Sequence, residues 1–241
     1  MKAKRQYRPR IQEDALRDFQ IRLLRWFGRH GRDLPWRRTR DPYKILVSEV
    51  MLQQTQVDRV REYYGRFLTE YPSVQELAAA RPSQVLESWD GLGYYARARH
   101  LHRTARMIVR EHGGQFPGQV EELMELPGIG RYTAGALVSF AFGRPAPILD
   151  TNVRRVLTRV FVRRRPASRV ALDRRLWAMA ELLIPGGRAW DFNQALMDFG
   201  ATVCTARNPA CSTCPLYGPC AWGRRVDREC EQKPMTERST G

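Results

Sequence analysis

Four cysteines near the C-terminal end of the chain have the spacing that points most clearly to chemistry. They are Cys204, Cys211, Cys214 and Cys220, all within one short stretch. Thiolates at these spacings can hold a [4Fe–4S] cluster or a zinc ion, but structural zinc usually joins two close ligand pairs separated by a longer finger. This stretch has no finger, so we expect a cluster with a structural role. Zinc and unliganded buried cysteines are the alternatives.

Two carboxylates are candidates for acting on a substrate. Asp150 directly precedes apolar residues at helical spacing, so we expect it to cap a helix, where the helix N-terminus favours an ionised carboxylate that can stabilise a cationic sugar. Glu49 lies in an otherwise apolar segment, and burial there would raise its pKa and suit it to general acid catalysis. The simpler interpretations are a plain helix cap and a residue on the polar stripe of a helix.

A glycine-rich segment, residues 126–130, lies between two helical patterns. Its sequence is Leu-Pro-Gly-Ile-Gly, and Gly128 and Gly130 allow a tight turn that leaves backbone N–H groups exposed at a helix start. Such groups can hold a phosphate directly or through a bound cation. A plain turn between two helices is the alternative.

The overall charge of the chain favours a polyanionic partner. Among 241 residues, 41 are basic and 25 acidic, which gives a net charge of +16. Nucleic acid is the commonest polyanion. No apolar run approaches the roughly 20 residues of a membrane span, and the first residues lack the apolar stretch of a secretory signal. We therefore expect a cytoplasmic, nucleoid-associated protein without a membrane partner, in which Cys230 is a bystander.

The elements that would position these residues are helical nearly throughout, so the expected class is all-α. Asp41 and Pro42 have the pattern of an N-cap followed by proline at the first helical position. Further helices are expected at 57–71, 74–80, 82–89, 96–112, 120–125, 131–142, 151–162, 171–183 and 191–203. The basic stretch 163–169 is expected to be an exposed loop, and the ends, about 1–12 and 224–241, to be flexible.

A set of motifs occurs along the chain, at residues 34–36, 41–43, 48–57, 91–97, 126–130 and 149–152 and at the four cysteines. Together these motifs resemble the MutY-type adenine DNA glycosylases of the helix–hairpin–helix, endonuclease III superfamily. The resemblance covers roughly residues 15–222. It implies a two-lobed helical fold with a cluster loop, in which mismatched or damaged double-stranded DNA lies across the cleft, a target nucleotide is flipped out, and the protein acts as a monomer. The implied divisions are 1–28 (an N-terminal arm and a helix that packs on the cluster lobe), 29–142 (a six-helix barrel with the helix–hairpin–helix), 143–223 (the cluster lobe with the catalytic Asp150 and the cluster loop) and 224–241 (a flexible tail).

The resemblance also implies roles for individual residues. Glu49 would protonate the adenine ring and activate water, Asp150 would stabilise the cationic sugar, and Tyr132 and Asn152 would complete the pocket. Gln54 and Tyr94 would enter the base stack beside the estranged base. Further DNA contacts are implied for Thr55, Gly128, Gly130 and Arg131, with a monovalent cation as a possible addition at the hairpin.

Two differences from relatives shape the expected activity. Tyr132 stands where endonuclease III relatives carry a Schiff-base lysine, so we expect base removal without efficient lyase cleavage. The chain ends about 20 residues after Cys220, so we expect a compact form without the domain that reads 8-oxoguanine. The expected substrate is adenine opposite guanine or 8-oxoguanine.

Two other functions stay open. Residues 185–187, 191–193 and 196–199 resemble compact thymine glycosylases that act on G·T and G·U mismatches, whereas residues 53–56 favour MutY. A non-catalytic iron–sulfur protein that binds DNA would also explain the charge and the cysteines.

Overall fold

The computed structural model describes residues 9, 11–164 and 166–224, and these residues contain helices and no strand, so the all-α prediction is confirmed. The expected flexible ends lie largely outside them, as does Cys230. The chain divides into two compact units, one of residues 33–148 and the other of the residues before and after that segment. The expected domain limits at 28 and 142 fall a few residues before the unit limits, and the assignment of roles to domains stays a prediction.

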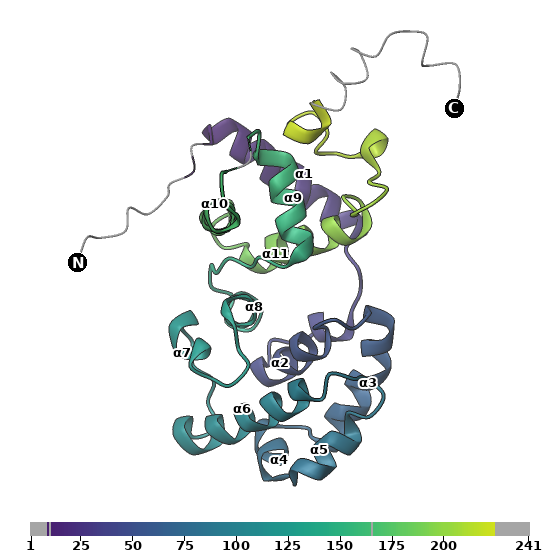
Figure 1. The fold of residues 1–241 in the computed structure, drawn as a ribbon, viewed down its shortest axis with the longest axis vertical. Helices are drawn as coiled ribbons and strands as arrows, with labels where there is room; N and C mark the ends of the chain where they lie inside the picture. Colours follow the sequence, from purple (N-terminus) through teal and green to yellow (C-terminus); the bar gives the residue numbers. More distant parts are fainter. Residues whose placement is uncertain (1–8, 10, 165, 225–241) are drawn as a thin grey trace, which may run out of the picture. The chain divides into compact units, whose positions relative to one another are not determined.

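One unit is built around two nearly fully buried helices, α2 and α8. Its elements are η1 (Pro35–Arg37), α2 (Pro42–Met51), α3 (Val57–Glu70), α4 (Val74–Ala79), α5 (Pro82–Ser88), α6 (Ala96–His112), α7 (Val120–Met124) and α8 (Arg131–Phe140). The α2 helix packs against α8, α3 and α6, and α6 packs against α4 and α5 (Figure 1). As predicted, Asp41 caps α2: its Oδ1 accepts a hydrogen bond from the Tyr43 N–H at 2.9 Å.

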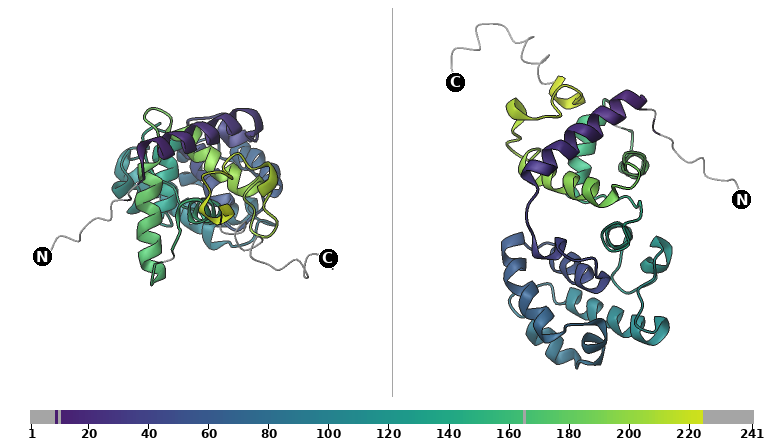
Figure 2. Two further views of the ribbon diagram at one scale, coloured as in Figure 1. Left: turned by 90° about the horizontal axis from the view of Figure 1, so that it is seen from above. Right: turned by 180° about the vertical axis from the view of Figure 1, so that it is seen from behind.

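The other unit joins the N-terminal helix to helices from the last third of the chain. Its elements are α1 (Glu13–His30), α9 (Thr151–Phe161), α10 (Arg169–Leu182), α11 (Ala189–Thr202) and η2 (Cys211–Thr213). The α11 helix packs against both α1 and α9, and Figure 2 shows this arrangement from two further sides. Asp198 is fully buried on α11, where the Arg32 guanidinium contacts its Oδ1 at 2.6 Å and the Arg32 backbone N–H donates to its Oδ2 at 2.9 Å.

Most helix positions were predicted to within two residues, and the main correction concerns α10. This helix begins at Arg169, inside the stretch expected to be a loop. The reason is Ser168, whose Oγ accepts a hydrogen bond from the Ala171 N–H at 3.1 Å and so caps the helix. In the part of the chain that the structure describes, no helix is both long and apolar enough to cross a membrane.

Candidate active site and cluster loop

Asp150 forms the N-cap of α9, as predicted from the sequence. Its Oδ1 accepts a hydrogen bond from the Val153 N–H at 2.6 Å, and its Oδ2 accepts one from the Asn152 Nδ2 at 3.1 Å. Burial raises the pKa of Asp150 above its ordinary value, while these hydrogen bonds and the charge of Arg155 lower it. The backbone N–H groups at the start of α9 thus favour the ionised carboxylate, as expected, while desolvation opposes them.

Arg155, which the sequence did not single out, connects this carboxylate to the cysteine loop. Its Nη2 donates to the Asn152 Oδ1 at 2.7 Å, and its Nε donates to the Cys204 carbonyl oxygen at 2.7 Å. Asn152 in turn donates to Asp150. A hydrogen-bonded chain thus runs from the candidate catalytic carboxylate to the first cysteine. The spacing of Asn152 and Arg155, three residues apart on a helix, was the available sequence signal.

Gly200 on α11 allows the close approach of α9 that this chain of hydrogen bonds requires. A Cβ at position 200 would lie 2.7 Å from the Asn152 Cβ and 3.0 Å from the Asn152 carbonyl carbon and oxygen. The Gly200 carbonyl oxygen also accepts a hydrogen bond from Arg155 at 2.5 Å. An isolated glycine within a helical pattern was the sequence signal for this contact.

The four cysteines come together in one loop that follows α11. Burial raises the pKa of the Cys214 thiol to about 11, and the thiols of Cys204, Cys220 and Cys211 add to this rise, so the four sulfurs lie near one another. Among the described residues, no group of three or more Cys, His, Asp or Glu side chains is placed to hold a single metal ion. Four thiols in one loop are a donor set that fits a [4Fe–4S] cluster.

Two of the loop sulfurs, those of Cys204 and Cys220, have hydrogen-bond donors of the protein beside them. The Arg159 Nη1 lies 3.4 Å from the Cys204 Sγ and donates to the Thr205 carbonyl oxygen at 2.7 Å. The Gly223 N–H donates to the Cys220 Sγ at 3.5 Å. Donors and a cation at these positions suit thiolates, whose negative charge they stabilise.

Glu49 lies in the other unit, on α2, and is buried, so it does not lie on an exposed polar stripe. Its side chain is 6% exposed, and every α2 residue from Ile45 to Met51 is buried. Tyr132 is half-buried in the first turn of α8. Burial provides the environment that general acid catalysis by Glu49 would require, and the catalytic roles of both residues stay predictions.

The predicted hairpin between α7 and α8 is present and rests on α6. Gly128 has φ +79°, and a Cβ there would lie 2.5 Å from the His100 Nδ1, so only glycine fits. The Thr104 hydroxyl donates to the Pro127 carbonyl oxygen at 2.7 Å. Gly130 is the N-cap of α8 with open space beside it, and Arg131 is exposed. The segment can thus present backbone N–H groups to an anion, and its phosphate and cation contacts stay predictions.

Gln54 and Tyr94, predicted to enter the base stack, share an uncommon backbone conformation. Among the described residues, they are the non-glycine residues with positive φ, at +58° and +50°. Tyr94 is 59% exposed and Gln54 is also exposed, so both side chains can reach a partner. Residues held in such sparsely populated conformations cluster at functional sites. Thr55 is half-buried and its Oγ1 accepts a hydrogen bond from Arg97 at 3.1 Å, so it also supports the turn.

Comparisons with known proteins agree with this set of features. Residues 47–181 match the model of the HhH-GPD superfamily base excision DNA repair proteins, and residues 204–220 match the iron–sulfur binding domain of endonuclease III. The chain therefore has an iron–sulfur binding motif, and Cys204, Cys211, Cys214 and Cys220, which lie within it, stay the predicted ligands.

Adenine DNA glycosylases are among the similar proteins. That of Homo sapiens is 46% identical over 220 residues, which cover 88% of this chain and 40% of the relative. That of Mycolicibacterium smegmatis is 46% identical over 203 residues, which cover 84% of this chain and 68% of the relative. The chain thus spans about two fifths of the mammalian relatives and two thirds of the mycobacterial one.

Solved structures of related enzymes share the fold. A thermostable thymine-DNA glycosylase matches with a TM-score of 0.80 and 32% identity, covering 88% of this chain and 98% of the other. An endonuclease III–DNA covalent intermediate matches with a TM-score of 0.76 and 26% identity, and the match covers 91% of this chain and 100% of the other. The chain therefore belongs to the HhH-GPD superfamily of base excision DNA repair proteins.

Proposed function

We propose that this chain is a DNA glycosylase that removes adenine opposite guanine or 8-oxoguanine in double-stranded DNA. The observation that carries the proposal is the half-buried Asp150 carboxylate, held at the start of α9 by Val153 and Asn152. Adenine DNA glycosylases that are 46% identical to the chain over more than four fifths of its length support adenine as the base.

The proposed reaction breaks the bond between C1′ of deoxyribose and the adenine ring. The bonding electrons leave with adenine, and the Glu49 carboxyl gives a proton to a ring nitrogen, which makes the base a better leaving group. The sugar becomes cationic, and the Asp150 carboxylate stabilises that charge. Water then adds to C1′ and returns its proton to Glu49. Tyr132 and Asn152 are proposed to line the pocket.

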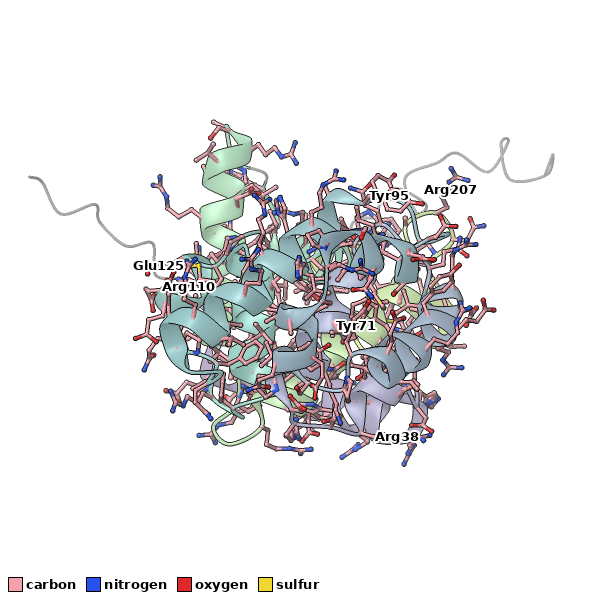
Figure 3. The ribbon with its side chains drawn as sticks, turned by 90° about the horizontal axis from the view of Figure 1, so that it is seen from below. Arg38, Tyr71, Tyr95, Arg110, Glu125 and Arg207 are labelled. Carbon is pink, nitrogen blue, oxygen red and sulfur yellow. The ribbon has the colours of Figure 1, made fainter. Side chains whose placement is uncertain are left out.

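DNA binding is supported by the charge of the chain and by its exposed loops. The net charge is +16, and Arg207 directs its guanidinium group away from the ribbon (Figure 3). A related fold, endonuclease III, has been solved with DNA. We propose that Gln54, Thr55 and Tyr94 contact the bases, and that Gly128, Gly130 and Arg131 contact phosphates. Flipping a base costs a few kcal/mol, and least at a mismatch, which favours mismatched sites.

Thymine or uracil removal is the second candidate, because a thymine-DNA glycosylase shares the fold with 32% identity. Single-turnover assays on A·G, A·8-oxoguanine, G·T and G·U duplexes distinguish the two. Release of adenine from the first two supports the proposal, and release of thymine or uracil alone supports the second candidate. Specific binding without release of any base supports the non-catalytic iron–sulfur protein.

Tyr132 supports a monofunctional reaction, because a phenol cannot form a Schiff base with the sugar as a lysine amine does. Borohydride should therefore trap little covalent protein–DNA adduct, and a strong adduct would overturn this part of the proposal. The monomeric state and the monovalent cation at the hairpin remain proposals.

A further inference from the structure

Arg97, in the first turn of α6, is a buried cation held by carbonyl oxygens. The residue is 9% exposed, and none of its partners among the described residues is a carboxylate. Burial lowers the pKa of its guanidinium, which shows the cost of placing the charge there. A side chain that carries such a cost needs several good hydrogen bonds to be retained in the fold.

Those hydrogen bonds join two loops that are far apart in sequence. The Nη1 donates to the carbonyl oxygens of Val50 at 3.0 Å and Met51 at 2.7 Å, and also to that of Gln53. The first two belong to the last turn of α2, where carbonyls lack helical partners and a cation is favourable. The Nη2 donates to the carbonyl oxygens of Leu92 and Gly93, both at 3.2 Å.

The two loops that Arg97 joins are those that carry Gln54 and Tyr94. Both residues have positive φ, a conformation that is unfavourable for side chains with a Cβ and persists only where surrounding contacts enforce it. The Arg97 guanidinium also lies over the rings of Tyr94 and Trp89, with its Cζ 5.4 and 5.5 Å from their centroids. One side chain therefore fixes both loops.

We propose that Arg97 is a positioning residue that holds Gln54 and Tyr94 as a single wedge for insertion into the base stack. The inference rests on the proposed function, which assigns these two residues to the DNA. Arginine suits this role because its planar fork presents donors in two directions at once. Lysine keeps the charge but presents three donors from one atom, so it cannot reach both loops.

The test combines Arg97→Lys with substitutions of the wedge residues. Unstacking is measured by the fluorescence of 2-aminopurine placed beside an A·G mismatch, base release by single turnover, and stability by thermal unfolding. We expect Arg97→Lys to lower mismatch-dependent unstacking and base release at least about 10-fold, since small displacements at a site cost up to about 100-fold. The matched control is Arg110→Lys, the same change at an exposed position of α6, and it should behave as wild type.

Double substitutions separate positioning from general destabilisation. Adding Gln54→Ala or Tyr94→Leu to Arg97→Lys should cost less than about 3-fold further, and less than either change costs alone, because the wedge is already displaced. The proposal would be overturned if the fold-loss of a double variant equals the product of the two single fold-losses. It would also be overturned if Arg97→Lys unstacks the duplex as well as the wild type does. A lower melting temperature with unchanged discrimination between mismatched and matched duplexes would also overturn it.

A second variant and a comparison of unstacking with base release in the wild type complete the test. If Arg97→Lys does not fold, Arg97→Gln keeps a planar donor group of shorter reach and should lower mismatch-dependent unstacking, whereas wild-type unstacking in this variant would overturn the proposal. If the wild type unstacks the duplex, the Arg97 variant does not, and neither releases a base, the proposed function fails and the positioning role stands. If the wild type leaves the 2-aminopurine stacked, the wedge and the role of Arg97 both fail.

Discussion

Arg155 donates a hydrogen bond from its Nη2 to the Asn152 Oδ1 at 2.7 Å and thereby orients the amide that donates to Asp150. The same guanidinium donates to the Cys204 carbonyl oxygen, so the carboxylate and the cluster loop share one support. A change in Arg155 should therefore affect both the pH dependence of the reaction and the cluster loop.

The first prediction concerns Arg155→Gln. The charge of Arg155 lowers the pKa of Asp150, so its removal should raise that pKa further and move the acid limb of the pH–rate profile to higher pH. The measurement is single-turnover base release across pH. Arg154→Gln makes the same change on the face of α9 that pairs with Asp173, and it should leave the acid limb in place. An unmoved limb in Arg155→Gln would show that its charge does not act on Asp150.

Asp150→Asn should separate activity from stability. Because burial raises the folded-state pKa of Asp150, its contribution favours folding below the unfolded-state pKa and is lost as pH rises through the folded-state pKa. Asparagine is also a good N-cap. At pH 7 we expect the variant to melt at or above the wild-type melting temperature. The difference between the two melting temperatures should become smaller as the pH falls. A clearly lower melting temperature at pH 7 would contradict the assigned burial cost.

Gly200→Ala should damage the site by overpacking. The added methyl would lie 2.7 Å from the Asn152 Cβ, so the first turn of α9 must shift. We expect a loss of about 1–3 kcal/mol in unfolding free energy and reduced base release. Gly65→Ala, on α3 with open space around it, should instead be neutral or stabilise by about 0.5–1 kcal/mol. Equal behaviour of the two variants would show that α9 and α11 are not closely packed at this point.

The helical frame and the cysteine loop were predictable because they follow from local patterns. Asp41 and Asp150 were found as caps, and the hairpin glycines were found from their spacing. Arg97 and Arg155 were not assigned roles, because their partners are backbone oxygens that only tertiary folding brings together. The burial that raises the pKa of Asp150 could not be predicted for the same reason, because it depends on the packing of α9, which the sequence of its first turn does not reveal.

The cysteine loop yields a prediction about composition. Purified protein should contain about four irons and four sulfides per chain, with the visible absorption of a [4Fe–4S] cluster. Cys214→Ser should lower the iron content and the stability of the loop. One zinc per chain, with no iron or sulfide, would contradict the cluster assignment.

The most direct test of the proposed chemistry is single-turnover release of adenine from an A·G duplex by the wild type, Glu49→Gln and Asp150→Asn. We predict that the wild type releases free adenine, and that each variant is slower by on the order of 100-fold or more while still binding the duplex. A wild type that binds the mismatch and releases nothing, or variants that release adenine at the wild-type rate, would contradict the roles assigned to the two carboxylates.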